Sequence, residues 1–191
     1  MRRVLPPSAA LAVAALAVAA LALAGVLYTG VLWFNMPSRA RWPIRGLDVS
    51  HHQGPIDWAA YTFCRPAADQ AANFLSVVPR EADALPPVVD VEFGGNCAAR
   101  PARDTLLAEL AVYRDAVEAG LGRRPVLYAT GDLARSYQLS DVAWVRDIFR
   151  EPAPPWTVWQ YSQRERVAGI DGYVDVNVFG GDEAAFARLV R

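Results

Sequence analysis

The sequence contains no lysine, because all 19 of its basic residues are arginine. Chemistry that needs a lysine amine, such as Schiff-base formation, is therefore excluded. Histidine is nearly as scarce: His51 and His52 are the only two, and no Cys/His spacing resembles a zinc site. The chain also lacks the G-x-S-x-G sequence of a serine-hydrolase nucleophile elbow, so a Ser-His-Asp hydrolase would depend on these two histidines alone. We predict no metal and no cofactor.

Neither sign of charge dominates the chain. The formal net charge is −1, and acidic and basic residues are mixed along the sequence without a long run of either sign. A nucleic-acid-binding surface needs clustered basic residues, so nucleic acid is not expected as a partner. We expect a monomer.

The two cysteines, Cys64 and Cys97, allow two interpretations. In a small exported domain such a pair favours a disulfide, whereas in a cytosolic domain both residues would be free thiols. The N-terminus favours export, since Met1-Arg2-Arg3 is basic and no charged residue occurs from Ala9 to Phe34. We therefore prefer the disulfide.

The uncharged run at the N-terminus is longer than the roughly 20 residues that cross a bilayer as a helix. We predict a short basic cytoplasmic segment (1–8), a transmembrane signal anchor (9–34), a polar linker (35–45) and one soluble domain (46–191). A signal peptide cleaved at Ala22-Leu23-Ala24 is the alternative. The positive charges on the two sides of the run nearly balance, so the orientation follows from the expected disulfide, which places the domain outside the cytoplasmic membrane.

The stretch from Val88 to Phe93 combines a buried-strand composition with two carboxylates. Asp90 and Glu92 are two residues apart, so on a strand they point to the same face. Two like charges close together near apolar surface cannot both ionise freely, and one pKa is expected to rise. A proton donor beside an anion is what glycosidic bond cleavage needs. The alternative is a strand end whose acids simply face solvent.

Helical and extended patterns alternate through the rest of the domain. Apolar residues recur every three or four positions from Arg103 to Ala119, which predicts a helix that ends at Gly120. Further helices are expected over 66–78 and over 182–190, the second with Asp182 as its N-cap. Short strands are expected over 46–50, 125–129, 143–145, 156–161 and 173–179. This alternation predicts an α/β fold with barrel-like closure.

Four acids lie near the C-terminal ends of the expected strands: Asp48, Asp90, Glu92 and Asp175. In a βα barrel these ends form one face, and that face carries the active site. Nearby aromatic side chains are candidates for stacking on sugar rings: Tyr128, Trp159 and Tyr161. Ordinary core packing is the alternative for each of these three residues. For a further aromatic residue, Trp144, core packing is the interpretation we favour.

Four short sequences, in this order along the chain, resemble glycoside hydrolase family 25, the Chalaropsis-type lysozymes. They are Gly46-Leu47-Asp48-Val49-Ser50-His51-His52-Gln53-Gly54, Val89-Asp90-Val91-Glu92, Trp159-Gln160-Tyr161-Ser162 and Val174-Asp175-Val176-Asn177. Each is weak alone, but the shared order is specific. The sequences around Cys64 and Cys97 resemble those of membrane-anchored members from Gram-negative bacteria.

The resemblance implies a TIM-like (β/α) barrel of mixed strands and an N-acetylmuramidase that cleaves the β-1,4 bond between N-acetylmuramic acid and N-acetylglucosamine in peptidoglycan. Glu92 matches the proton donor and Asp90 the neighbouring acid that stabilises the transition state or orients the acetamido group. Asp48 and Asp175 match the remaining carboxylates. Asn177 belongs to the fourth motif and is a further candidate for substrate binding. Glycan strands and, through the anchor, the membrane are the expected partners.

The chain departs from the family pattern after Trp58. In the family, a segment with a helix and a strand separates the Asp-Trp motif from the sequence that here reads Tyr61-Thr62-Phe63-Cys64, whereas in this chain only Ala59-Ala60 intervene. A barrel links strand number to tilt and diameter, so the loss is not local. We therefore expect an incomplete or rearranged barrel. A non-catalytic peptidoglycan-binding relative or a degenerate deletion product is the alternative function.

Overall fold

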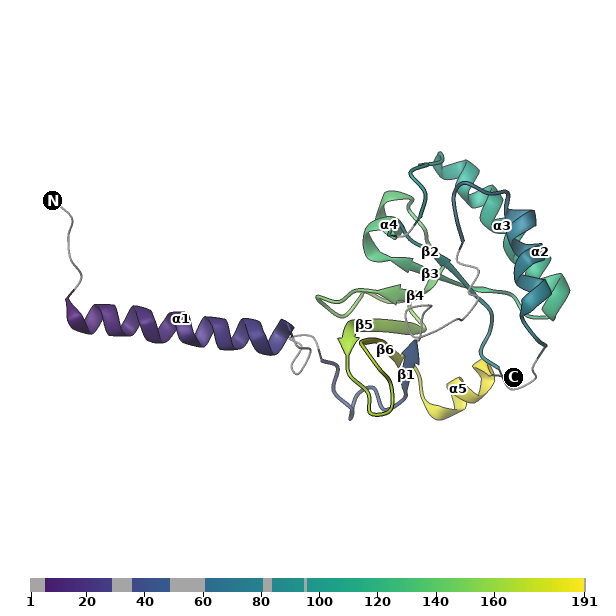
Figure 1. The fold of residues 1–191 in the computed structure, drawn as a ribbon. Coiled ribbons are helices and arrows are strands. Elements are labelled where there is room, and N and C mark those ends of the chain that lie inside the picture. The colour runs from purple at the N-terminus through teal and green to yellow at the C-terminus, as the bar shows by residue number, and fades with distance from the viewer. Residues whose placement is uncertain (1–5, 29–35, 49–60, 81–83, 95, 191) are drawn as a thin grey trace.

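The computed structural model describes residues 6–28, 36–48, 61–80, 84–94 and 96–190 (Figure 1). Its helices and strands follow one another in this order: α1 (Pro7–Tyr28), β1 (Arg45–Asp48), α2 (Ala67–Val77), β2 (Val88–Val91), α3 (Arg103–Leu121), β3 (Val126–Thr130), α4 (Gly131–Ser136), β4 (Val142–Arg146), β5 (Val158–Glu165), β6 (Val174–Phe179) and α5 (Glu183–Leu189).

The six strands form one mixed sheet in the order β1-β6-β5-β4-β3-β2. Strands β2, β3, β4 and β5 run parallel to one another, while β6 is antiparallel to both β5 and β1. The predicted α/β class is confirmed. Within the described residues β1 and β2 are the two edges of an open sheet, so the expected barrel closure is not found there.

The helices α2 and α3 pack against each other and contribute to the larger of two cores. Buried apolar residues of both helices join side chains of β2 and β3: Ala67, Ala71, Leu106, Leu110, Tyr113, Val117, Val89, Val91, Leu127 and Ala129. In β2 the burial alternates, because Val89 and Val91 enter this core while Asp90 does not. The strand thus presents its acid to the face opposite the helices, as period-two geometry requires.

The prediction that α3 ends at Gly120 is wrong. The helix continues to Leu121, and its cap is Gly122, whose φ of 76° is the left-handed conformation that glycine adopts most readily. Gly120 has a different role. A Cβ there would lie 2.5 Å from the nearest side-chain carbon of Leu75, so the glycine permits close approach of α2 and α3.

A second core lies against β5 and β6. Its buried members are Trp159, Tyr161, Val174, Val176 and Val178. Residues 36–44, expected to form a linker, contribute to it through Trp42, whose ring lies 5.0 Å from that of Trp156. The described part of this segment therefore packs against the domain.

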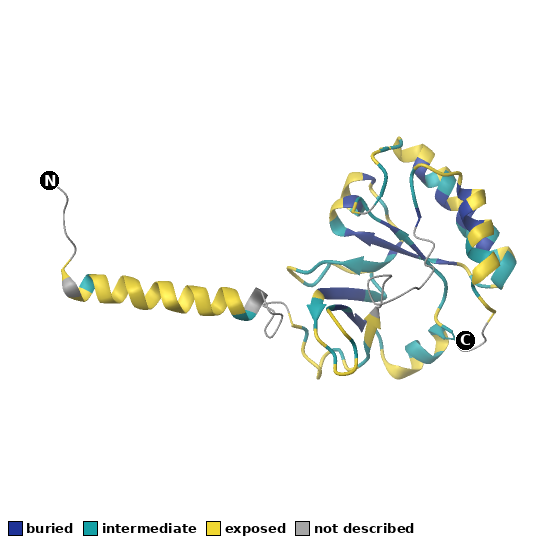
Figure 2. Cartoon of the chain, in the orientation of Figure 1, coloured by how far each residue is buried: buried dark blue, intermediate teal, exposed yellow. Residues whose placement is uncertain are grey.

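The N-terminal helix α1 is long and apolar enough to cross a membrane, judged by the length and composition of Ser8–Val26. Its described side chains are nearly all exposed, and Figure 2 shows it as an almost continuous exposed surface. Length and composition alone do not distinguish a membrane span from a signal sequence near the N-terminus.

Candidate active site

The acids predicted at one rim come from strands that run in different directions. Asp90 lies in β2, but the prediction that Glu92 lies on the same strand is wrong, because β2 ends at Val91 and Glu92 directly follows it. Asp175 is the second residue of β6, so the prediction that it ends a strand is wrong. Because β6 is antiparallel to β5, however, its first residues lie at the same edge as the C-terminal ends of the parallel strands. The backbone of Asp48 pairs with that of Asp175 and also lies at this edge.

Glu92 has an environment that favours its protonated form. Its pKa is raised first by burial and then by the negative charges of Asp175 and Asp132, while the positive charge of Arg146 opposes the rise. The expected rise in the pKa of one carboxyl is thus found at Glu92. Burial is a larger cause of this rise than like-charge repulsion.

Tyr128 connects the acids to the interior of the sheet. It pairs with Asp90 across β2 and β3, and its buried hydroxyl donates a hydrogen bond of 2.8 Å to Oε1 of Gln160. Burial raises the pKa of Tyr128, and the charges of Asp90 and Glu92 raise it further. Tyr128 therefore lies with these two acids and remains a neutral hydrogen-bonding group.

Sequence reasoning missed two charged residues of this cluster, Asp132 and Arg146. Asp132 follows β3 in the unpredicted helix α4, and its pKa is lowered by the neighbouring Thr130 side chain and by backbone N–H groups at the start of the helix. Arg146 ends β4, with Nη1 4.0 Å from Oε2 of Glu92. Both lie at or directly after the C-terminal end of a parallel strand. The expectation that active-site residues lie at these strand ends, which was applied to Glu92, would also have identified them.

The other aromatic candidates do not gather at the acids. Trp159 and Tyr161 are buried in the second core. The indole of Trp159 donates to the carbonyl of Asp147, and the hydroxyl of Tyr161 accepts from Arg45. Both alternate with Gln160, whose side chain reaches Tyr128 on the opposite face. The structure therefore does not bring Trp159 or Tyr161 to the acids.

Trp144 lies next to Tyr128, and Asn177 is hydrogen-bonded to Trp144. The indole N–H of Trp144 donates a 2.9 Å hydrogen bond to Oδ1 of Asn177, and the Trp144 ring meets that of Tyr128 edge to face at 6.1 Å. Asn177 is buried. Trp144, expected in the core, is instead partly buried and contacts both Tyr128 and Asn177.

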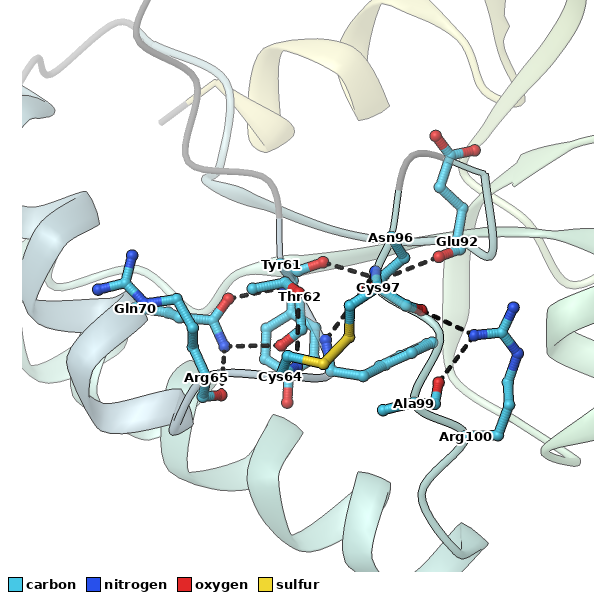
Figure 3. The surroundings of a disulfide bond; sticks show 11 residues. Tyr61, Thr62, Cys64, Arg65, Gln70, Glu92, Asn96, Cys97, Ala99 and Arg100 are labelled. Carbon is cyan, nitrogen blue, oxygen red and sulfur yellow. Dashed lines mark hydrogen bonds between the residues drawn. A yellow bond between two sulfur atoms is a disulfide. The ribbon is translucent and has the colours of Figure 1, made fainter.

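The loop after Glu92 is tied to the segment that follows the shortened part of the chain. Cys64 and Cys97 form the predicted disulfide, with a Cα–Cα distance of 6.2 Å. Asn96, next to the bridge, bonds the carbonyls of both Glu92 and Tyr61 (Figure 3). The motif residues His51 and His52 and the junction at Trp58 lie outside the described residues.

A metal site is not found among the described residues, where no group of three or more His, Cys, Asp or Glu side chains is placed to hold an ion. The acids at the sheet edge lie instead near the guanidinium of Arg146 and the buried side chain of Tyr128. Such a cluster is able to hold one carboxyl protonated beside others that are ionised, which is an arrangement suited to acid catalysis.

Comparison with known proteins agrees with this arrangement. The profile of the family described as glycosyl hydrolases family 25 matches residues 59–170, more than half of the chain, and this range includes Asp90 and Glu92. The chain belongs to glycosyl hydrolase family 25. The solved structure of a family 25 glycosyl hydrolase from Bacillus anthracis has 27% sequence identity and a TM-score of 0.70, and the match covers 82% of this chain and 98% of that one.

Two further relatives of this family 25 chain bear on its length. The uncharacterized protein YegX of Escherichia coli O157:H7 is 32% identical over 156 residues, which are 76% of this chain and 56% of YegX. This chain thus spans about half the length of YegX. Lysozyme M1 of Streptomyces globisporus is 25% identical over 210 residues, covering 78% of this chain and 71% of that protein. That alignment exceeds the 191 residues of this chain, so it bridges a segment that the chain lacks.

Proposed function

We propose that this family 25 member hydrolyses peptidoglycan as a lysozyme, at the β-1,4 bond between N-acetylmuramic acid and N-acetylglucosamine. The observation that carries the proposal is the raised pKa of Glu92 inside a cluster of acids at one edge of the sheet. A carboxyl whose pKa is raised keeps its proton to higher pH than an ordinary glutamate, and it is able to give that proton to the oxygen of the leaving sugar.

In this proposal each acid has a role. Glu92 is the proton donor. Asp90, in β2 two residues before Glu92, stabilises positive charge in the transition state or orients the acetamido group of the substrate. Asp175 and Asp48 complete the anionic cleft, and Tyr128 and Asn177 support the bound sugar from the sheet below. Retention by substrate assistance and inversion are the two alternatives for the reaction, and the separation of the two carboxyls bears on which of them applies.

The proposed location is the outer side of the cytoplasmic membrane. The apolar helix α1 would act as a signal anchor, and the domain would follow it on the periplasmic or extracellular side. The Cys64–Cys97 disulfide supports this placement, because disulfides form and persist in oxidising compartments. Peptidoglycan lies in the same compartment, and we propose that the protein meets it as a monomer.

A second candidate is a peptidoglycan-binding relative without hydrolytic activity. The open sheet favours it, because β2 has no second strand partner among the described residues and one wall of the cleft would be incomplete. The acids at the sheet edge, grouped around a carboxyl with a raised pKa, favour hydrolysis.

The deciding experiment uses the full chain, purified in detergent from cells that form disulfides, together with Glu92→Gln. Both proteins are incubated with purified peptidoglycan, and new reducing ends are identified by mass spectrometry. The amide keeps the shape of the carboxyl but has no proton to donate, so we expect muramic acid reducing ends from the parent chain alone. Equal hydrolysis by Glu92→Gln would exclude Glu92 as the donor, and binding without products would support the second candidate.

A further inference from the structure

We propose that Asn96 is a positioning residue for Glu92. The side-chain amide of Asn96 holds the backbone at the end of β2 against the segment that begins at Tyr61, which follows the shortened part of the chain. The inference rests on the proposed role of Glu92 as proton donor. It concerns how the backbone that carries the donor is held, and it involves no direct contact between Asn96 and substrate.

The amide of Asn96 makes four hydrogen bonds within the described part of the chain. Nδ2 donates to the carbonyl of Glu92 at 3.0 Å and to the carbonyl of Tyr61 at 3.2 Å. Oδ1 accepts from the backbone N–H of Phe63 at 3.0 Å and of Cys97 at 2.9 Å. Two donors and two acceptor lone pairs are the full capacity of an asparagine side chain. No other side chain of this length offers two hydrogen-bond donors together with two acceptor lone pairs.

Glu92 needs such support because it lies just beyond the sheet. The pairing of β2 with β3 ends at Val91, opposite Ala129, and β2 is an edge strand of the described sheet. The loop that follows is closed by a weak backbone bond from Asn96 N–H to the carbonyl of Phe93, at 3.4 Å. The side chain of Asn96 adds a second and shorter connection, directly to the backbone of Glu92.

The other side of the amide is anchored to a rigid segment. Gln70 of α2 accepts from the N–H of Thr62 at 2.7 Å and donates to the carbonyls of Thr62 and Arg65 at 2.9 and 2.8 Å. The Cys64–Cys97 disulfide joins the same two segments one residue beyond the Asn96 bonds (Figure 3). Asn96 thus links Glu92 to a segment that is held by a helix and a covalent bridge.

The position of the Glu92 carboxyl decides its chemistry. Its raised pKa depends on burial and on its distances from Asp175, Asp132 and Arg146. Movement of the backbone at Glu92 by a fraction of an ångström would change these distances and would displace the proton from the glycosidic oxygen. Catalytic steps are sensitive to such displacement. Loss of the amide should therefore lower kcat more than it raises KM.

The test compares Asn96→Ala with Gln70→Ala in the full chain. Gln70→Ala is the matched control, because it removes three bonds to the same segment and none to Glu92. The pKa of Glu92 is measured by carbon-13 NMR of protein labelled in its glutamate carboxyls, with the Glu92 signal assigned by its absence from Glu92→Gln. The kcat and KM of peptidoglycan hydrolysis are measured on the same samples.

We expect Asn96→Ala to shift the pKa of Glu92 toward the ordinary value for glutamate and to lower kcat by about 10- to 100-fold. Gln70→Ala should shift that pKa less, because the disulfide and the bond from Asn96 to the Glu92 carbonyl remain. An unchanged pKa and kcat in folded Asn96→Ala would overturn the proposal, as would an equal shift in Gln70→Ala. If Asn96→Ala does not fold, Asn96→Asp decides, since it retains the acceptor for Phe63 and Cys97, loses both donors and adds a negative charge beside the Glu92 carbonyl. A wild-type kcat in Asn96→Asp would overturn the proposal.

The two proposals fail in different ways. If the parent chain does not cleave peptidoglycan but Asn96→Ala still shifts the pKa of Glu92, the proposed function is wrong and the positioning role stands. If the parent chain cleaves peptidoglycan and neither the pKa nor kcat responds to Asn96→Ala, the positioning role alone is wrong.

Discussion

The guanidinium of Arg146 lies 4.0 Å from the carboxylate of Glu92, across the end of strand β3. Each side chain is partly buried, so solvent screens their attraction only in part. Arg146 also bonds the side chain of Gln163. Protonation of Glu92 is therefore a balance in which burial and nearby acids raise the pKa and one cation lowers it.

Arg146→Gln should raise the pKa of Glu92 further, because it removes the one charge that lowers it. If Glu92 is the proton donor, the basic limb of the kcat/KM profile for peptidoglycan should then move to higher pH. Arg150→Gln is the control, since Arg150 is highly exposed and pairs with Asp147 instead. A profile that is the same in Arg146→Gln and the parent chain would contradict this balance.

Glu92→Gln should stabilise the folded protein at neutral pH. A carboxyl whose pKa is raised by folding binds its proton more tightly in the folded state, so stability is complete below the unfolded pKa and falls as pH rises through the folded pKa. Glutamine does not titrate and avoids this loss.

The measurement is the free energy of unfolding in urea at a series of pH values for both proteins. The gain from Glu92→Gln should appear above the ordinary glutamate pKa and vanish in acid, where Glu92 is protonated in both states. A gain that is independent of pH would show that packing rather than ionisation separates the two proteins.

The disulfide should contribute strongly to stability. Cys64 and Cys97 are 33 positions apart, and closing a loop of that length is expected to stabilise the fold by about 3–4 kcal/mol. The Cys64→Ser/Cys97→Ser double variant should therefore unfold at clearly lower temperature than the parent chain. Reductant should lower the melting temperature of the parent and leave that of the double variant unchanged. An unchanged melting temperature of the parent chain in reductant would contradict the prediction.

Local pattern was sufficient where the physical cause is local. The helix α3 follows from apolar spacing, and α2 agrees with Pro66 near its first turn. Asp182 caps α5 by accepting from the N–H of Ala185, as expected. The alternation in β2 follows from strand geometry, which separates the face of Val89 from that of Asp90. The end of α3 was misjudged because a glycine inside a helix and a glycine after it look alike in sequence.

The direction of a strand was beyond the reach of local pattern. Asp175 begins β6 rather than ending a strand, and it reaches the acid edge only because β6 runs antiparallel to β5. The sequence also did not predict whether Trp159 and Tyr161 lie on the face of the sheet that carries the acids. Alternation along the strand shows that they share a face but not which face that is. Asp132 and Arg146 were accessible in principle from their places after β3 and in β4.

The sequence by itself determined the family, the two closely spaced acids Asp90 and Glu92 and the cysteines available for a bridge, because these depend on residue identity and short-range spacing. Only the tertiary structure decided that the sheet is open between β1 and β2 in the described residues, that Arg146 opposes the acids at Glu92, and that Asn96 links Glu92 to the Cys64 segment. Burial, charge separation and hydrogen bonding between distant segments exist only once the chain has folded.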